Sequence, residues 1–92
     1  MDAKAAETLA VKALVWMAER DELVSGFLGA SGADAGDLRA RAADPEFLGF
    51  VLDFLLQDED ALLGFCDDEG VKPDAPWRAR QALPGGDIPN WT

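Results

Sequence analysis

The sequence predicts an all-α protein, a compact bundle of about six short helices built from two pseudo-symmetric three-helix repeats. Helical periodicity predicts the helices, because apolar residues recur at spacings of three and four. No segment alternates apolar and polar residues as a strand does. Sequence repetition predicts the symmetry: a repeat of this length usually marks one supersecondary unit used twice, so we expect a single core with approximate two-fold symmetry.

The repeat aligns residues 7–45 with residues 46–84. The shared landmarks are a Gly-Phe pair, a glycine, an Arg-Ala-Arg triplet and a proline. In the first unit they are Gly26-Phe27, Gly32, Arg39-Ala40-Arg41 and Pro45; in the second they are Gly64-Phe65, Gly70, Arg78-Ala79-Arg80 and Pro84. The spacing between equivalent residues is one longer at the prolines than at the phenylalanines, which places an inserted residue after Gly70.

Three helices are predicted in the first unit. The first covers residues 2–19, with an aspartate that can cap its start and apolar residues along one face. The second covers residues 21–30, and Gly32 follows at the position where a left-handed residue normally ends a helix. The third covers residues 34–43, and its first residue forms a capping-box pattern with Asp37.

The second unit begins with Asp44-Pro45, a cap followed by proline in the first helical position. The helix over residues 45–56 is apolar on nearly every side, so we expect it to be the central buried element. A fifth helix covers residues 59–69 and ends at Gly70, and a sixth covers residues 74–83.

We expect one domain over residues 1–84, followed by a tail over residues 85–92. No signal peptide is visible, and the apolar runs are too short for a membrane span. The single cysteine, Cys66, cannot form an internal disulfide and fits a reducing compartment. These features predict a cytoplasmic protein. The net charge of −10, from 18 acidic and 8 basic residues, disfavours nucleic acid and anionic membranes as partners.

One stretch of the first helix, Ala13-Leu14-Val15-Trp16-Met17-Ala18, is similar to the opening of the family called domain of unknown function 3572. Further segments resemble the landmarks of that family in consistent order over residues 5–84. They are Gly26-Phe27-Leu28, Gly32, Leu38-Arg39, Asp44-Pro45-Glu46-Phe47-Leu48, Val51-Leu52-Asp53-Phe54-Leu55-Leu56 and Asp58-Glu59. The resemblance implies a small all-helical bacterial protein. It implies no activity, cofactor or catalytic residue.

Asp53 is the only charge in the middle of the most apolar helix, where an unpaired carboxylate would be costly. We expect a structural ion pair with Arg39 or Arg41, or bonds from a helix N-terminus, with Gly49 leaving a gap toward the surface. The alternative is a catalytic acid in a pocket. The chain contains no His and no Tyr, which disfavours that alternative.

Asp67, Asp68 and Glu69 occupy the last turn of a helix, where acids oppose the helix dipole at a cost of about 0.3–1 kcal/mol each. One explanation is neutralisation by Arg78 and Arg80, and another is a solvated face. A functional explanation is an acidic surface that docks a basic partner or weakly collects divalent cations. The spacing matches neither an EF-hand loop nor a His/Cys metal motif.

The aromatic and sulfur-bearing residues have simple structural interpretations. Cys66 lies in an apolar stripe and is expected to be a small buried hydrophobe, its pKa raised by the acids beside it. Trp16 and Trp77 are expected in the core. Trp91, in the tail, either packs on its own domain or is disordered, and the functional alternative is that it anchors a partner.

The sequence therefore predicts a non-enzymatic protein–protein interaction module with an acidic surface, a basic or amphipathic protein partner and no cofactor. The first alternative is a small enzyme or divalent-cation factor using Asp53 or the three acids 67–69. The second is a helix-turn-helix-like nucleic-acid binder using the duplicated Arg-Ala-Arg motif, which the net charge opposes. The apolar surplus is also compatible with a homodimer, on which the sequence does not decide.

Overall fold

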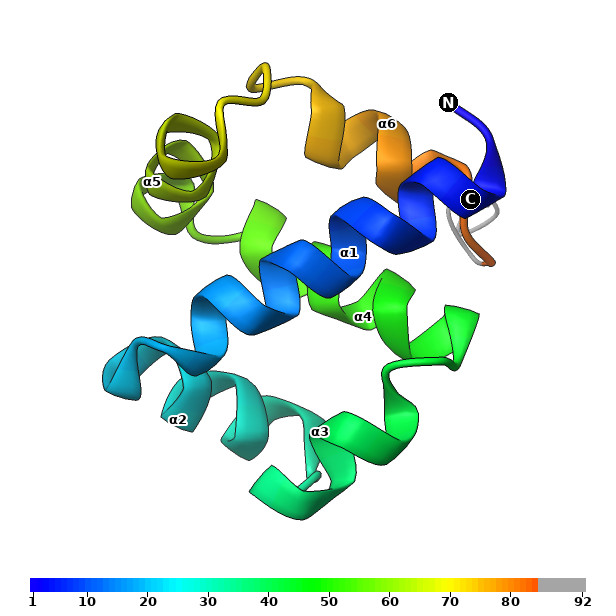
Figure 1. Cartoon of the computed structure of the whole chain (residues 1–92). Helices are drawn as coiled ribbons and strands as arrows, with labels where there is room; N and C mark the ends of the chain where they lie inside the picture. The colour runs from blue at the N-terminus through cyan, green and yellow to red at the C-terminus, as the bar shows by residue number, and fades with distance from the viewer. Residues whose placement is uncertain (85–92) are drawn as a thin grey trace, which may run out of the picture.

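Six helices make up residues 1–84, the part of the chain that the computed structural model describes (Figure 1). They are α1 (Ala3–Ala18), α2 (Asp21–Ser31), α3 (Ala35–Arg41), α4 (Pro45–Leu56), α5 (Glu59–Glu69) and α6 (Ala75–Gln81). The described residues contain no strand. The predicted all-α fold of about six short helices is thereby confirmed.

Aspartates begin most of these helices, as their positions in the sequence predict. Four of them accept a hydrogen bond from a backbone N–H of the first turn: Asp2, Asp34, Asp44 and Asp58. Asp34 also forms the predicted capping box, because its own N–H donates to Asp37. Each cap gives a partner to a backbone N–H that the helix itself leaves unsatisfied.

Gly32 and Gly70 end α2 and α5 in the left-handed conformation, with φ of 73° and 67°. Residues with a Cβ rarely adopt this conformation, which is why glycine occupies both positions. The two units also share helix lengths, since α2 and α5 each have 11 residues and α3 and α6 each have 7.

The core lies where α1 and α4 cross. α4 contributes a stripe of fully buried aliphatic residues at helical spacing: Leu48, Val51, Leu52 and Leu55. Phe27 from α2 inserts beside it, with its ring centroid 5.7 Å from Phe47 and 5.4 Å from Phe54. α6 covers both α1 and α4. These contacts close a single apolar cluster around α4.

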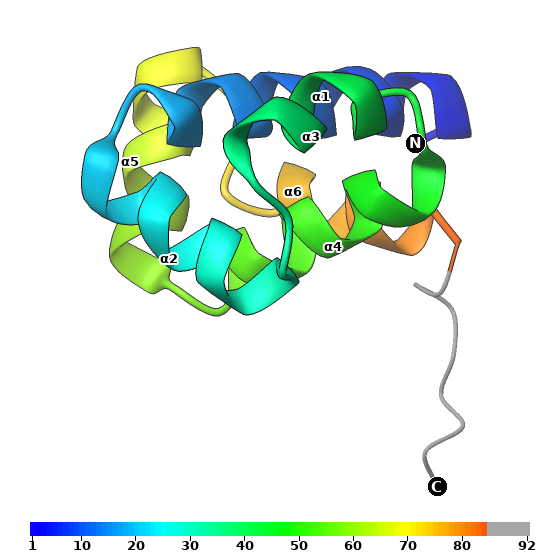
Figure 2. The ribbon, with the colours of Figure 1, turned by 90° about the horizontal axis from the view of Figure 1, so that it is seen from below.

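Packing differs between the two units. Figure 2 shows α1 and α3 in one layer and α2 and α4 in the other. α6 packs extensively against α1 and α4, whereas α3 makes only sparse contact with other helices among the described residues. Equal helix lengths therefore do not bring equal packing, and the two-fold symmetry stays a prediction.

Candidate functional site

Asp53 on α4 is bound by Arg80 on α6. Arg80 Nε donates to Oδ1 at 2.6 Å and Nη2 donates to Oδ2 at 3.1 Å, which is a two-pronged ion pair. The Arg80 side chain is 14% exposed and that of Asp53 is 42% exposed. Gly49 leaves room for the guanidinium, because a Cβ there would lie 3.0 Å from Nη1.

The predicted pairing of Asp53 with Arg39 or Arg41 is therefore wrong. The cause is the packing of the helices: α6 lies against α4, whereas α3, which carries both other arginines, makes only sparse contact with other helices. A guanidinium satisfied by Asp53 and by the Pro84 carbonyl at 3.0 Å holds α4 to the end of α6. This arrangement is a structural ion pair.

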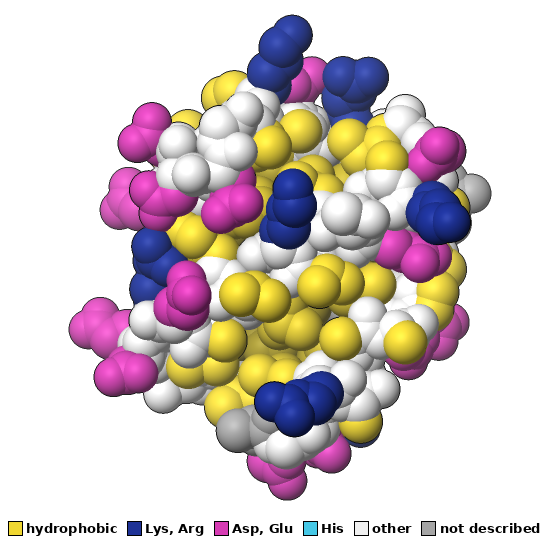
Figure 3. Space-filling view, in the orientation of Figure 1, with side chains coloured by type: hydrophobic (Ala, Val, Ile, Leu, Met, Phe, Trp, Pro, Cys, Tyr) yellow, Lys and Arg dark blue, Asp and Glu magenta, His cyan; other side chains and the backbone are white. Residues whose placement is uncertain are grey.

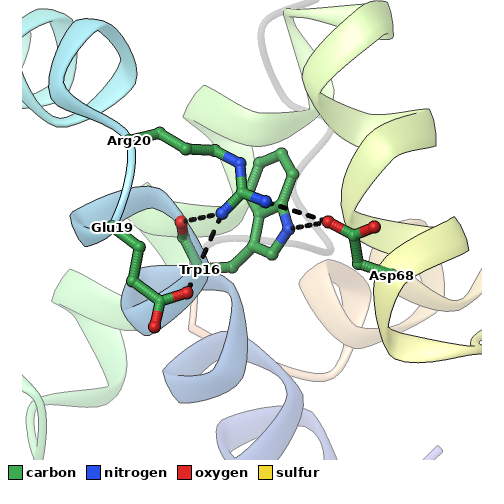
Figure 4. A network of polar contacts seen from close by, with 4 residues as sticks. All are labelled: Trp16, Glu19, Arg20 and Asp68. Atoms are coloured by element: carbon green, nitrogen blue, oxygen red, sulfur yellow. Dashed lines mark hydrogen bonds and ion pairs between the residues drawn. The ribbon is translucent and has the colours of Figure 1, made fainter.

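A second polar network joins α1 to α5 (Figure 4). The Trp16 indole Nε1–H donates to Asp68 Oδ2 at 2.7 Å, and Arg20 Nη2 donates to the same oxygen at 2.9 Å. Arg20 also lies over the indole, with Cζ 3.8 Å from the ring centroid, and donates to the Trp16 carbonyl at 2.8 Å. Glu19 adds a longer ion pair at 3.9 Å. The Arg20 guanidinium thus contacts the indole ring, the Trp16 carbonyl oxygen and the carboxylates of Asp68 and Glu19.

This network changes the interpretation of the acidic turn. Arg20 neutralises Asp68, and the predicted neutralisation by Arg78 and Arg80 is wrong, because those two pair with Asp74 at 3.7 Å and with Asp53. Asp67 and Glu69 are exposed and form no ion pair with the described residues. Of the three acids proposed to bind a partner, Asp67 and Glu69 are thus available on the surface, whereas Asp68 is held by Trp16 and Arg20. The fourth candidate, Trp91, lies outside the described residues.

Cys66 is buried against the core, as predicted. Its Sγ–H donates to the Lys72 carbonyl oxygen at 3.7 Å, and desolvation by burial raises the pKa of the thiol. The cause is burial, where the sequence pointed to the neighbouring acids. A protonated thiol is a poor nucleophile.

The described residues hold no group of three or more His, Cys, Asp or Glu side chains that could bind a metal ion. Among the same residues no helix is long and apolar enough to cross a membrane.

The two described tryptophans differ in exposure. Trp16 is in the core as predicted, whereas Trp77 is 55% exposed, so its predicted burial is wrong. α6 turns Pro76 and Ala79 toward the core. Trp77 follows Pro76 directly and is rotated by about 100° around the helix axis, which carries its ring to the surface.

An open apolar groove, which sequence reasoning missed, lies between α1, α2 and α3. It has a volume of about 490 Å³. Its lining residues are Val11, Leu14, Val15, Ala18, Val24, Leu28, Leu38, Arg39 and Ala42. We call it the three-helix groove. Figure 3 shows hydrophobic side chains gathered over this part of the surface, with most acidic side chains toward its periphery. Val15, one of the lining residues, is 54% exposed.

A signal for the groove was present in the sequence. Val15 falls outside the apolar stripe that packs α1 onto the core, so the sequence places an apolar side chain on the outer face of the helix. The rest of the groove depends on how far α3 stands from α1 and α2, which local sequence does not encode.

Cations border the three-helix groove. Arg39 lines it directly. A shallower recess, which shares Val11 with the groove, continues along α1 between Lys4, Glu7 and Lys12. The three cations are exposed, and none forms an ion pair with the described residues. The border of the groove therefore has a local excess of positive charge, with three cations and one carboxylate, although the net charge of the chain is −10.

Fold and surface together define a small all-α protein with an exposed apolar groove. The chain belongs to the family described as "Protein of unknown function (DUF3572)", whose model matches residues 3–86. The resemblance seen in the sequence over residues 5–84 is thereby confirmed. No match to the chain was found among curated proteins or among solved structures.

Proposed function

We propose that this chain is a non-enzymatic protein–protein interaction module and that the three-helix groove receives a helix of a partner protein. The observation that carries the proposal is the groove itself: apolar side chains from three helices line an opening that folding leaves uncovered. Contiguous exposed apolar surface is typical of protein-interaction sites and ligand-binding grooves. An all-helical surface has no sheet edge to extend, so the fitting mode is a helix laid into the groove.

The state of the acidic residues favours this function over catalysis or cation binding. Asp53 is held by Arg80, and Asp68 is held by Arg20 and Trp16. Of the acids on which the enzymatic alternative relied, only Asp67 and Glu69 are without a partner among the described residues. The same fact weakens docking of a basic partner on the acidic turn, because only these two carboxylates are available for it.

The nucleic-acid alternative has even less support. It would need the duplicated arginines to form a cationic surface. Arg78 and Arg80 instead pair with Asp74 and Asp53. The net charge of −10 opposes approach to phosphates in addition.

Two further expectations from the sequence are part of the proposal. A bacterial cytoplasmic location is supported by the family resemblance and by the single cysteine, which fits a reducing compartment. The pseudo-two-fold relation between the units is supported by the equal lengths of α2 and α5 and of α3 and α6, and by the left-handed glycines at equivalent positions, Gly32 and Gly70.

Photocross-linking in cells tests the docking surface. In one variant a benzophenone amino acid replaces Val15, which lines the groove. In the control it replaces Trp77 on α6, because the native side chains at the two positions are similarly exposed. We expect the Val15 variant to give a discrete cross-linked product that maps to one helical segment of another protein. The Trp77 variant should give background only. Equal products from both positions would contradict the proposal, and cross-links to a second copy would assign the groove to a homodimer.

A further inference from the structure

We infer that the partner helix is acidic and amphipathic, with carboxylates on both sides of its apolar stripe. This inference rests on the proposed function, because it specifies what binds in the same groove. It reverses the expectation that an acidic protein of this kind binds a basic partner. The argument depends on where the few cations of the chain lie.

The chain has 8 basic residues, and three of them pair with carboxylates of the described residues: Arg20, Arg78 and Arg80. The other five make no such ion pair. Three of these five border the three-helix groove or its extension along α1: Lys4, Lys12 and Arg39. Most of the cations without an ion pair among the described residues thus lie where apolar surface is open.

Arg39 lines the three-helix groove on α3, and Lys12 lines the adjoining recess on α1. Lys12 follows Val11 on α1 and lies one turn before Val15, at the three-residue spacing that makes two side chains neighbours. Arg39 belongs to α3, the opposite wall, directly after the buried Leu38. A helix lying between these walls would present one flank to Lys12 and the other to Arg39. Carboxylates on both flanks would therefore meet opposite charges.

A basic helix would meet like charges at the same two positions, although the protein as a whole attracts cations. The distance over which salt screens a charge decides whether the net charge of the protein or the cations near the groove have the larger effect on the partner helix. At physiological ionic strength, exposed charges are screened beyond about 8 Å, so distant acids act weakly inside the groove and its own rim dominates. The cations Lys4, Lys12 and Arg39 therefore favour a partner helix whose flanks carry negative charge.

Synthetic peptides test the sign. Three amphipathic helical peptides of about five turns share one apolar stripe. One has Glu flanks, one has Lys flanks, and one has the Glu composition in scrambled order. Each is titrated into isotope-labelled protein and followed by NMR. We expect the Glu peptide to shift the amides of Val11, Val15 and Leu28, with affinity about tenfold above that of the Lys peptide, and to lose this advantage at high salt.

Charge reversal supplies the matched control. Lys12→Glu with Arg39→Glu removes the cations of the recess on α1 and of the groove wall on α3, while Lys72→Glu with Arg41→Glu produces the same net charge at two residues that line neither. We expect the first pair to weaken the Glu peptide about tenfold and the second to change its affinity by less than about twofold. Circular dichroism confirms that both variants remain helical.

The outcomes separate this inference from the proposed function. Tighter binding of the Lys peptide, or equal effects of the two double variants, would overturn the inference while cross-links from Val15 still support a docking groove. Absence of discrete cross-links from Val15 would overturn the proposed function itself. A concentration-dependent dimer in sedimentation, lost on Val15→Glu, would assign the groove to a second copy of the chain and overturn both.

Discussion

The indole nitrogen of Trp16 lies 2.7 Å from Oδ2 of Asp68, although 52 residues separate them. Asp68 sits in the last turn of α5, where the helix dipole disfavours a carboxylate. The indole N–H and the Arg20 guanidinium offset that cost by donating to the same oxygen. A residue that looks misplaced along its own helix is therefore one of the ties between the first and second units.

Asp68→Ala is expected to lower the free energy of unfolding by about 1–3 kcal/mol, because it leaves the mostly buried indole N–H and the Arg20 guanidinium without their acceptor. Urea denaturation followed by circular dichroism measures the change. The control is Asp67→Ala, which removes an exposed neighbour and should stay within about 0.5 kcal/mol of the wild type. Equal midpoints for the two variants would contradict the structural role of Asp68.

The Asp53–Arg80 pair is expected to show a coupling energy of about 1–2 kcal/mol in a double-mutant cycle with alanine at both positions. Arg80 is the more buried partner, so Asp53→Ala alone also destabilises by leaving a desolvated cation. A parallel cycle with Arg39→Ala in place of Arg80→Ala should give a coupling near zero. Similar couplings in the two cycles would reassign the partner of Asp53.

Two glycines in helices should respond to alanine in opposite directions. Gly29→Ala in α2 meets no atom within 4 Å, so the gain in helix propensity should raise the free energy of unfolding by about 0.5–1 kcal/mol. Gly49→Ala places a methyl group 3.0 Å from Arg80 Nη1 and 3.4 Å from the Pro84 carbonyl oxygen. Because Arg80 is held by Asp53, we expect net destabilisation. Thermal unfolding of both variants checks the sign.

Burial of Cys66 should appear in the pH dependence of stability. Desolvation raises the thiol pKa above its ordinary value of 9.0, so the folded state binds this proton more tightly than the unfolded state. The resulting stability is fully present below pH 9.0 and is lost as the pH rises through the folded pKa. We expect the wild type to lose stability relative to Cys66→Ala above that pH in urea denaturation. A constant difference across the range would mean that the thiol is not desolvated.

The bounds of the helices could be predicted almost residue by residue because each end is determined by residues a few positions away in the sequence. The Asp34 capping box and the glycines at positions 32 and 70 act within three or four residues of the helix they start or stop. The buried stripe of α4 follows from apolar residues at spacings of three and four. Cys66 and Trp16 could be placed in the core by the same periodicity.

The candidate sites were predicted less well, since they depend on which helices meet. The need of Asp53 for a partner could be anticipated, but its partner is 27 residues away on α6, the helix that packs on α4. Trp77 is exposed because α6 uses its other residues to contact the core. The partners of Asp68 could not be anticipated because they come from α1 and from the N-cap of α2, Trp16 and Arg20.

By itself, the sequence determined six helices, their caps, the apolar stripe of α4 and membership of the family. These features follow from interactions between residues a few positions apart and from the periodicity of apolar side chains. Only the tertiary structure decided the ion-pair partners, the exposure of Trp77 and the three-helix groove with its cationic rim. The physical reason is that each of these depends on the distance and rotation between packed helices, which many side chains determine together and no local pattern records.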